Sequence, residues 1–450
     1  MIEPEIVVLG AGLAGLGAAF QLNRHGIKTI IFDKENTIGG LCRSIKKDSF
    51  LFDIGPHIVF SPPSEIENLV SSLLDNDEVY IHESMLYHHQ IGGKYIRAPY
   101  QAHLYGLPRK DIILSLLDFI LARARDEKKA DNYADFFKSV LGNTIYKNFF
   151  LPYDNKRLRY TPYLLDAEWV KHRVTTPSLL EIVRGAIKDT GSSIGDNASF
   201  RYPHQGGIQN FTNSLADRLF PNQIHLNKEV YKINPAAKKI EFKDGSTQHY
   251  EKLLSSLPIP DIIEMIEGIP DDIKMISRNE IKYTSGYVIN LGVNREDVSP
   301  YRIIRYHEPD IIFYRVTVQS NIASYSSLPG HSILCSEISY HPERFPLSRE
   351  EAIMKTINDL KKVGLLRSES EIITQNVTDL KYCHLIFQRN FEHHLDRVLN
   401  YLHQNDIYSF GRWGGWQYLL MGPSILSGIK VVDKLLKEMK SRRVFDLAVA

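Results

Sequence analysis

The chain has few cysteines, no long uninterrupted hydrophobic run and almost no net charge. Its three cysteines, Cys42, Cys335 and Cys383, lie far apart in 450 residues, so we expect neither a disulfide framework nor a metal site. Lys and Arg number 54 against 53 Asp and Glu, a net charge of +1, which gives no basis for nucleic-acid binding. The scarcity of cysteine favours a cytoplasmic protein, and the balanced charge gives no sign of a strongly acidic partner.

No segment has the length and apolar character of a membrane span. The nearest, residues 112–122, is short and interrupted by Ser115 and Asp118. We expect an amphipathic helix whose apolar stripe lies in the core, with contact to a membrane surface as the alternative and no stable insertion. The first residues carry no basic stretch followed by an apolar one, so no signal peptide is expected. The stripe comprises Ile112, Ile113, Leu116, Leu117, Ile120 and Leu121.

The most informative pattern lies near the start of the chain. Residues 6–9 form an apolar run of the kind found in buried parallel strands. Gly10, Gly12 and Gly15 follow in the G-x-G-x-x-G spacing and open an amphipathic helix. Such glycines permit a tight turn, close approach of a pyrophosphate and close packing of helix on strand. The pattern predicts a dinucleotide at the N-terminus of this helix.

A second apolar strand, residues 29–32, ends in Asp33, which is placed to bind a ribose hydroxyl. A glycine pair at residues 39 and 40 then precedes Arg43. A glycine turn with a solvated arginine is the alternative interpretation, but the strand–glycine–helix–strand order favours an adenine dinucleotide site.

Further along, the composition changes twice. Residues from about 108 to 188 are mostly helical in pattern, although residues 151–156 form a polar interruption. Residues 275–345 alternate short β-rich runs that suggest a separate antiparallel sheet. The sequence therefore predicts an α/β fold, with a Rossmann-like domain, a helical insert and an antiparallel β-sheet domain.

Several motifs together resemble a known family. With the glycine motif and Asp33, the sequence FDIGPHI at residues 52–58 resembles flavin-dependent enzymes of the amine oxidase and protoporphyrinogen oxidase type. More closely, the chain resembles the UDP-galactopyranose mutases. Further matching motifs, in chain order, are APYQ at 98–101, FRYP at 200–203, FYR at 313–315, GR at 411–412 and Tyr418.

The resemblance implies the domain limits and the cofactor. A discontinuous FAD-binding domain would comprise residues 1–95, 200–265 and 390–450. A helical substrate domain would comprise residues 96–199, and an antiparallel sheet domain residues 266–389. It also implies FAD in its reduced form, an external reductant such as NAD(P)H, and a nucleotide-sugar substrate, and it allows a homodimer.

The resemblance implies a mutase that interconverts pyranose and furanose forms of a nucleotide sugar, with the reduced flavin N5 as nucleophile on the anomeric carbon. An FAD-dependent oxidoreductase of the amine oxidase or protoporphyrinogen oxidase type, which passes hydride from substrate to flavin, is the alternative. A flavin-binding scaffold without chemistry is a third hypothesis.

The mutase reading requires cations that grip the departing pyrophosphate, because guanidinium groups match phosphate oxygens. By resemblance these are Arg173 and Arg315. If the two converge on one anionic site they support the mutase, and if they point apart they support the oxidase.

The implied catalytic residues are His57, Arg173, Arg315 and Tyr418. The implied substrate-binding residues are Gln101, Tyr153, Arg173, Arg315 and Tyr418. The implied cofactor-binding residues are Gly10, Gly12, Leu13, Ala14, Gly15, Asp33, Lys34, Gly40, Leu41, Arg43, His57, Val230, Gly411, Arg412, Tyr418 and Ser424.

The chain departs from the family pattern at two places. Leu158 stands near the position where the family has a tryptophan, and no proline follows Tyr382, where the chain continues Cys383-His384. The identity of the nucleotide and of the sugar therefore stays open. Trp416, within the last motif, is expected in the core.

Overall fold

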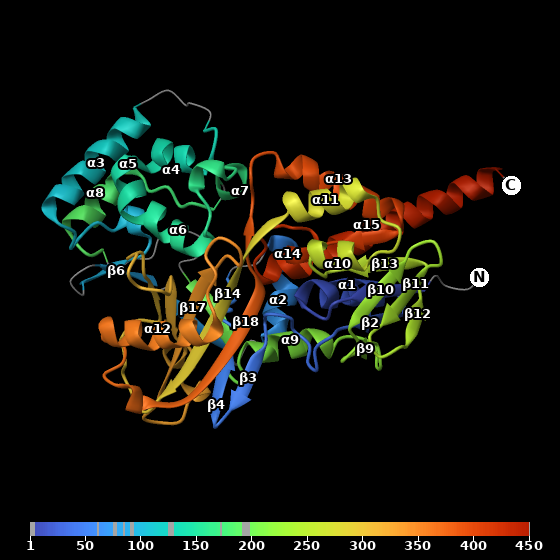
Figure 1. Cartoon of the computed structure of the whole chain (residues 1–450), viewed down its shortest axis with the longest axis horizontal. Coiled ribbons are helices and arrows are strands. Elements are labelled where there is room, and N and C mark those ends of the chain that lie inside the picture. Colours follow the sequence, from blue (N-terminus) through green and yellow to red (C-terminus); the bar gives the residue numbers. More distant parts are fainter. Residues whose placement is uncertain are drawn as a thin grey trace.

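The computed structural model has the predicted fold class, with a parallel sheet and separate sheets of mainly antiparallel strands (Figure 1). It describes residues 5–60, 63–74, 79–83, 86–90, 94–124, 130–171, 173–190 and 199–449. Figure 1 shows three parts: the helical insert at upper left, a large sheet at lower left and the nucleotide-binding fold on the right.

The nucleotide-binding fold is built on a five-stranded parallel sheet in the order β19-β13-β1-β2-β9. Successive side chains of β1 point to opposite faces: Val8 joins the core beneath α1 and α15, whereas Val7 joins the core beneath α10 and α13. The sheet is therefore covered on both faces, as its continuous apolar strands predict. Its strands are β1 (Ile6–Leu9), β2 (Thr29–Phe32), β9 (Ile224–His225), β13 (Lys252–Ser255) and β19 (Ile407–Ser409). Its helices are α1 (Leu13–Arg24), α2 (Glu67–Leu73), α9 (Ile208–Ala216), α10 (Ile259–Met265), α11 (Asp271–Asn279), α13 (Phe391–Gln404), α14 (Gly411–Gly414) and α15 (Met421–Val449).

Helices α1 and α15 approach each other closely through glycine. A Cβ atom on Gly17 would lie 2.6 Å from the carbonyl oxygen of Ile425, and one on Gly428 would lie 2.1 Å from that of Ala14. Because these contacts are to backbone atoms, no side-chain rotation could relieve them. The first and last helices of the fold are thus fixed against each other.

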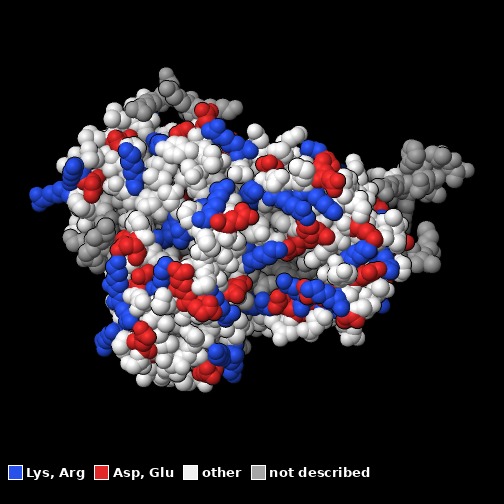
Figure 2. Space-filling model, in the orientation of Figure 1, with Lys and Arg blue, Asp and Glu red and all other residues white. Residues whose placement is uncertain are grey.

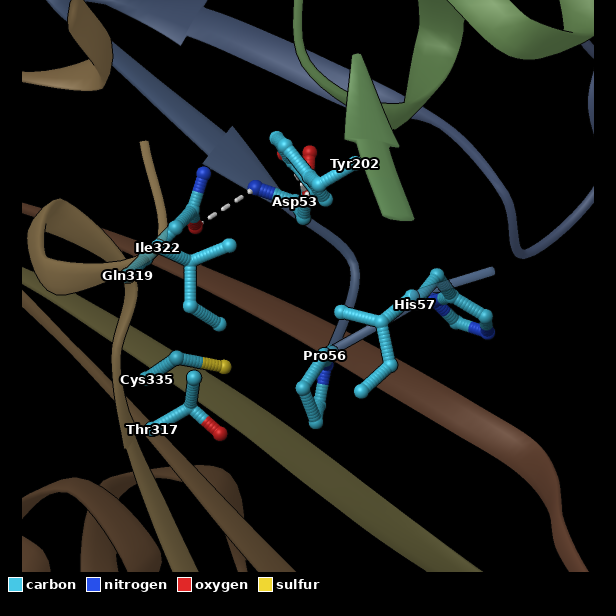
Figure 3. A pocket seen from close by; sticks show the side chains of 10 residues that line it. Asp53, Pro56, His57, Tyr202, Thr317, Gln319, Ile322 and Cys335 are labelled. Carbon is cyan, nitrogen blue, oxygen red and sulfur yellow. Dashed lines mark hydrogen bonds between the residues drawn. The ribbon is translucent and has the colours of Figure 1, made fainter. Parts of the chain in front are cut away.

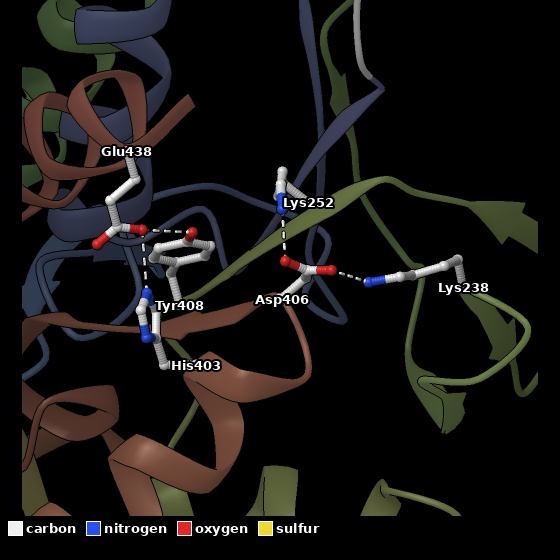
Figure 4. Close-up of polar contacts among 6 residues, drawn as sticks. All are labelled: Lys238, Lys252, His403, Asp406, Tyr408 and Glu438. Atoms are coloured by element: carbon white, nitrogen blue, oxygen red, sulfur yellow. Dashed lines mark hydrogen bonds and ion pairs between the residues drawn. The ribbon is translucent and has the colours of Figure 1, made fainter. Parts of the chain in front are cut away.

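Two carboxylates tie the end of the chain to this fold (Figure 4). Asp406, just before β19, pairs with both Lys238 and Lys252. On α15, Glu438 accepts a hydrogen bond from the hydroxyl of Tyr408 at 2.8 Å and lies 3.0 Å from His403 Nε2. The smaller strands of this part form a three-stranded sheet and two two-stranded ones: β10 (Val230–Asn234), β11 (Lys239–Phe242), β12 (Thr247–His249), β3 (Ser44–Lys47), β4 (Phe50–Asp53), β5 (Val79–Glu83) and β8 (Ser199–Pro203).

The large sheet has seven strands in the order β18-β14-β17-β16-β15-β6-β7, and α12 (Arg349–Lys362) packs on its core. The sequence division places residues 86–95 with the first domain, but β6 and the start of β7 join this sheet. The sheet is also not purely antiparallel, because β15 pairs with β6 in parallel. Its strands are β6 (Leu86–Gln90), β7 (Lys94–Arg97), β14 (Lys282–Val293), β15 (Ile303–Arg305), β16 (Arg315–Val318), β17 (Ser332–Tyr340) and β18 (Ile372–Ile386).

Two predictions for the helical insert differ from the structure. Residues 151–156, expected as a polar interruption, lie in a helix, since the backbone continues from 146–150 into α6. The expected core stripe on α3 is wrong for Ile113, Leu117, Ile120 and Leu121, which are exposed. The helix buries Ser115 and Phe119 instead, so the protein packs against another side of it. The helices are α3 (Arg109–Arg123), α4 (Tyr133–Leu141), α5 (Asn143–Ile145), α6 (Leu151–Leu158), α7 (Glu168–Lys171) and α8 (Leu179–Ile187).

Within the described residues, no helix combines the length and the apolar character needed to cross a bilayer.

The α1–α15 contact yields a prediction. Gly428→Leu should lower the free energy of unfolding by about 2–3 kcal/mol, because the new side chain meets the backbone of α1. Lys437→Leu introduces the same side chain at an exposed position of α15 and serves as the control. Urea denaturation of both variants measures the difference, and equal stability of the two would contradict the role given to this contact.

Candidate active site

The glycine motif lies at the carboxyl end of β1, where the chain turns into α1. A Cβ atom on Gly15 would lie 1.8 Å from the carbonyl oxygen of Gly10, so helix and turn touch backbone to backbone. The second glycine loop lies beside the first: the amide of Gly39 donates to the carbonyl of Ala11 at 2.9 Å, and a Cβ on Gly40 would lie 3.4 Å from Cα of Gly12. Leu13 and Ala14 begin α1 at this point and are buried.

Asp33 follows β2 and is fixed by the same loop. Its carboxylate accepts from the amides of Ala11 at 2.7 Å and Glu35 at 2.9 Å. Its own carbonyl accepts from the amide of Lys228, which brings the start of β10 and the buried Val230 close to the end of β2. Lys34 is exposed.

Arg43 and Gly411 lie in two further loop segments near the glycine loops of residues 10–15 and 39–40. Arg43 donates to Glu35 at 2.8 Å, while its buried Nε has no hydrogen-bond partner among the described residues. A Cβ on Gly411 would lie 2.7 Å from that of Ala14, so the loop after β19 packs on the start of α1. Leu41 lies half-buried between Gly40 and Arg43, and Ser424 lies in the first turn of α15.

A cavity of about 310 Å³ lies between the helical insert, the large sheet and the loop that ends in Tyr418. All five residues expected to bind substrate line it, although Arg173 is exposed to solvent there. Gln101 donates to the carbonyl of Thr175 at 2.8 Å, and the buried Tyr153 stacks on Phe149 with ring centroids 5.2 Å apart. The polar lining includes Gln101, Asp154, Arg157, Arg173, Arg305, Arg315 and His384, and the aromatic lining Tyr100, Tyr133, Phe137, Phe149, Phe150, Tyr153, Trp169, Tyr314 and Tyr418.

The sheet contributes a row of charges across three adjacent strands. Arg305 on β15 lies directly opposite Arg315 on β16, and Arg315 lies opposite Glu337 on β17. Arg315 donates two hydrogen bonds to Glu337, which also accepts from the hydroxyl of Tyr314 at 3.0 Å. Glu337 therefore orients Arg315, whereas Arg305 has no carboxylate in this row.

The insert contributes a second oriented arginine. Arg157 lies one helical turn after Tyr153 on α6, and two of its nitrogens donate to Asp154 at 2.9 and 3.1 Å. The other oxygen of Asp154 accepts from the hydroxyl of Tyr133 at 2.6 Å. Asp154 is the only carboxylate among the described residues that line the cavity, against four arginines. Since Glu337 compensates Arg315, the cavity keeps a net positive charge from Arg173 and Arg305.

The ring of Tyr418 contacts the guanidinium groups of Arg173 and Arg412. The guanidinium of Arg173 is 3.8 Å from the centroid of its ring, and that of Arg412 is 4.4 Å away. Arg173 also donates to the carbonyl of Tyr418 at 2.8 Å. Burial alone raises the pKa of Tyr418, but the charges of the four arginines at 412, 157, 173 and 315 outweigh it and lower that pKa to about 8.

His57 lies outside the large cavity. It lines a separate small cavity of about 10 Å³, as do Asp53 and Tyr202 (Figure 3). Burial lowers the pKa of His57 to about 4, with the charges of Arg315 and Arg412 acting against that of Glu337. The imidazole is therefore neutral near pH 7, and its buried Nδ1 has no hydrogen-bond partner in the described part of the chain.

Arg157, Arg305 and His384 are among the lining residues that the sequence analysis did not assign to the site. The spacing of four after Tyr153 would have indicated Arg157 if α6 had been recognised as a helix. Arg305 gives no such signal, because its position opposite Arg315 depends on how β15 and β16 pair. His384, noted only as a departure, is buried, and neither of its ring nitrogens has a hydrogen-bond partner among the described residues. Burial and the charges of nearby arginines lower its pKa well below the ordinary value, so it is uncharged. Trp416 is buried, as expected.

The pKa of Tyr418 gives a prediction. Tyr418→Phe should remove one tyrosine that ionises near pH 8, and Arg412→Leu should move that ionisation to higher pH. Because the folded pKa lies below the value of about 10 for a free tyrosine, Tyr418 should add stability as the pH rises from about 8 towards 10.

Ultraviolet difference absorbance of tyrosinate measures the ionisation, and urea unfolding at neutral and alkaline pH measures the stability. Tyr231→Phe, at an exposed tyrosine, is the control. An unchanged titration in Tyr418→Phe would contradict the assignment.

Comparison with known proteins places the chain in a family. A family profile described as flavin containing amine oxidoreductase matches residues 13–398, most of the chain. The crystal structure of a reduced UDP-galactopyranose mutase aligns with a TM-score of 0.90 and 26% identity, over 97% of this chain and 94% of that one. A CLA-producing fatty acid isomerase from P. acnes aligns with a TM-score of 0.67 over 96% of this chain and 98% of that one, and at 13% identity it shows the fold alone.

A 4,4'-diapophytoene desaturase (4,4'-diaponeurosporene-forming) of Staphylococcus aureus (strain COL) is 47% identical over 58 residues. These residues are 13% of this chain and span only 12% of that enzyme's length. The match to the family profile extends through all three parts of the fold. The chain therefore belongs to the flavin containing amine oxidoreductase family.

Proposed function

We propose that the protein is a flavin-dependent mutase that interconverts pyranose and furanose forms of a nucleotide sugar. The observation that carries this proposal is the position of Arg173 and Arg315, which come from different parts of the fold and line one cavity. Arg157 and Arg305 line it as well. The similarity to the reduced UDP-galactopyranose mutase over nearly the whole chain supports the same conclusion.

The residues present fit FAD. The two glycine loops leave backbone exposed side by side, since Gly12 and Gly40 have no side chains to separate them from a pyrophosphate. The orphaned Nε of Arg43 offers a buried donor beside these loops. The residues that would hold FAD are Gly10, Gly12, Leu13, Ala14, Gly15, Asp33, Lys34, Gly40, Leu41, Arg43, His57, Val230, Gly411, Arg412, Tyr418 and Ser424. When bound and reduced, FAD supplies the nucleophile, its N5 atom.

The chain's own residues bind and orient the substrate. Arg173 and Arg315 grip the pyrophosphate, and Tyr418 contacts it between Arg173 and Arg412. Tyr153 and Gln101 lie at the insert wall, where the aromatic side chains offer stacking surfaces to a nucleobase. His57 is neutral, so towards bound FAD it would act as a hydrogen-bonding group rather than as a fixed charge.

The electrostatics favour the mutase over an amine oxidase. A protonated amine would enter a cavity with four arginines and one carboxylate, and would be repelled. Arg173 and Arg305 have no carboxylate partner among the described residues, and a nucleoside diphosphate brings the negative charge that they lack. An apolar substrate would leave them unpaired at a high desolvation cost.

The proposal predicts a loss of nucleotide affinity on removal of one arginine. Arg173→Ala should weaken the binding of UDP by about 10- to 100-fold, because a charge-assisted hydrogen bond to the pyrophosphate is lost. Arg173 is the better choice than Arg315, since truncation of Arg315 would leave Glu337 buried and unpaired. Arg349→Ala, at an exposed arginine on α12, is the control.

Titration calorimetry with UDP and other nucleoside diphosphates, with flavin oxidised and chemically reduced, measures the affinity. Turnover of a nucleotide sugar by the reduced enzyme then tests the chemistry. A flavin-loaded protein that binds no nucleoside diphosphate in either redox state would contradict the mutase and favour the oxidoreductase alternative. Binding without turnover would favour a scaffold.

A further inference from the structure

Helix α3 presents an apolar face to solvent. Its exposed Ile and Leu residues recur at spacings of three and four, so they lie on one side of the helix. The opposite side packs on α4 and α5. Exposed fractions on this face are 57% for Ile113, 52% for Leu117, 44% for Ile120 and 54% for Leu121.

Helix α8 extends this apolar face. It contacts α3, and Figure 1 shows the two side by side at the end of the insert farthest from the nucleotide-binding fold. Leu180 is 57% exposed and Ile187 is 70% exposed. We call the exposed apolar residues of the two helices the α3–α8 face: Ile113, Leu114, Leu117, Ile120, Leu121, Leu179, Leu180 and Ile187.

Basic residues flank the α3–α8 face. Arg109 and Lys110 precede it by one turn on α3, and Arg184 and Lys188 lie within and after α8. None of these, nor Arg123, pairs with a carboxylate in the described part of the chain. Figure 2 shows Lys and Arg side chains projecting at the left-hand end of the molecule, where these helices lie. The exposed basic residues are Arg109, Lys110, Arg123, Arg184 and Lys188.

Helices α3 and α8 carry three carboxylates, Asp111 in the first turn of α3, Asp118 and Glu181, and the last two are engaged within the insert. Asp118 accepts from the backbone and the hydroxyl of Thr144, at 2.8 and 2.6 Å. Glu181 closes the capping box of α8 with Ser178. The face is therefore apolar with a basic margin.

The apolar residues and their basic margin together indicate which kind of partner the α3–α8 face binds. A second copy packed on the same face by two-fold symmetry would bring one set of basic residues near the other, with few free carboxylates to compensate. An anionic lipid surface complements both features, because apolar side chains enter the acyl boundary and Lys and Arg meet the headgroups. We propose that the α3–α8 face binds peripherally to the surface of an anionic lipid membrane.

Binding of this kind needs no spanning helix, and it should weaken as salt screens the basic margin. The proposal concerns a surface of the insert and is independent of the chemistry assigned to the cavity.

Co-sedimentation of the full flavin-loaded chain with vesicles tests it. Vesicles of phosphatidylcholine with phosphatidylglycerol should bind the protein, whereas vesicles of phosphatidylcholine alone should bind it much less. The triple substitution Ile113→Ser, Leu117→Ser and Leu121→Ser should lower the partition coefficient by about tenfold or more. Arg109→Glu with Lys110→Glu should lower it by several-fold and reduce its dependence on salt.

The control carries Met275→Ser and Met354→Ser, at exposed apolar residues of α11 and α12, and should bind as the unmodified protein does. Unchanged flavin content and circular dichroism show that each variant is folded. The proposal is overturned if the unmodified protein does not bind anionic vesicles, or if the triple variant binds them equally well. A concentration-dependent dimer that the same substitutions dissociate, without vesicle binding, would assign the face to a second copy.

Discussion

Mutual repulsion among the guanidinium groups around the cavity is the constraint on which the site depends. Two unit charges 4 Å apart repel by about 4 kcal/mol at an effective dielectric constant of about 20. The structure offsets part of this repulsion with Glu337 on Arg315 and with Asp154 on Arg157. Arg173 and Arg412 instead lie against the ring of Tyr418. The remaining positive charge has no carboxylate partner among the residues that the structure describes, and an anionic ligand would compensate it.

Each compensating group comes from a different part of the fold, so the cavity needs all three parts in place. The sheet fixes Arg315 through its register with Glu337, and α6 fixes Arg157 beside Asp154. Arg412 and Tyr418 lie between β19 and α15, where the amide of Gly411 donates to the hydroxyl of Ser427 at 3.0 Å. The close packing of α15 on α1 therefore positions one wall of the cavity as well as the glycine loops.

Local features of the fold could be predicted from the sequence. The strand, glycine loop and helix at the N-terminus depend on short-range backbone requirements that the residues themselves express. Gln101, Tyr153, Arg173, Arg315 and Tyr418 could be proposed because motifs carry them. Their roles stay predictions, although the structure brings all five to one cavity.

Features that depend on tertiary contacts could not be predicted. Arg305 faces Arg315 only because β15 and β16 pair in one particular register. The charged residues of 151–158 gave no sign of a partly buried helix, because charged side chains usually face water. In the structure Lys156 donates to the carbonyl of Tyr306, and Arg157 pairs with Asp154 on the same helix. The stripe on α3 has the periodicity of a buried face, and periodicity cannot show that a protein leaves such a face uncovered.

The charge of the cavity is nearly constant with pH. Arginine does not titrate in the accessible range, and burial and the nearby arginines keep His384 neutral at neutral pH. Tyr418 is the exception, since its pKa of about 8 is set by the same arginines. Its ionisation places a negative charge among them and competes with an anionic ligand. By linkage, a bound pyrophosphate that neutralises the arginines must in turn raise the pKa of Tyr418. If the proposed function holds, the pH dependence of nucleotide affinity and the shift of the Tyr418 pKa on nucleotide binding measure the same electrostatic coupling.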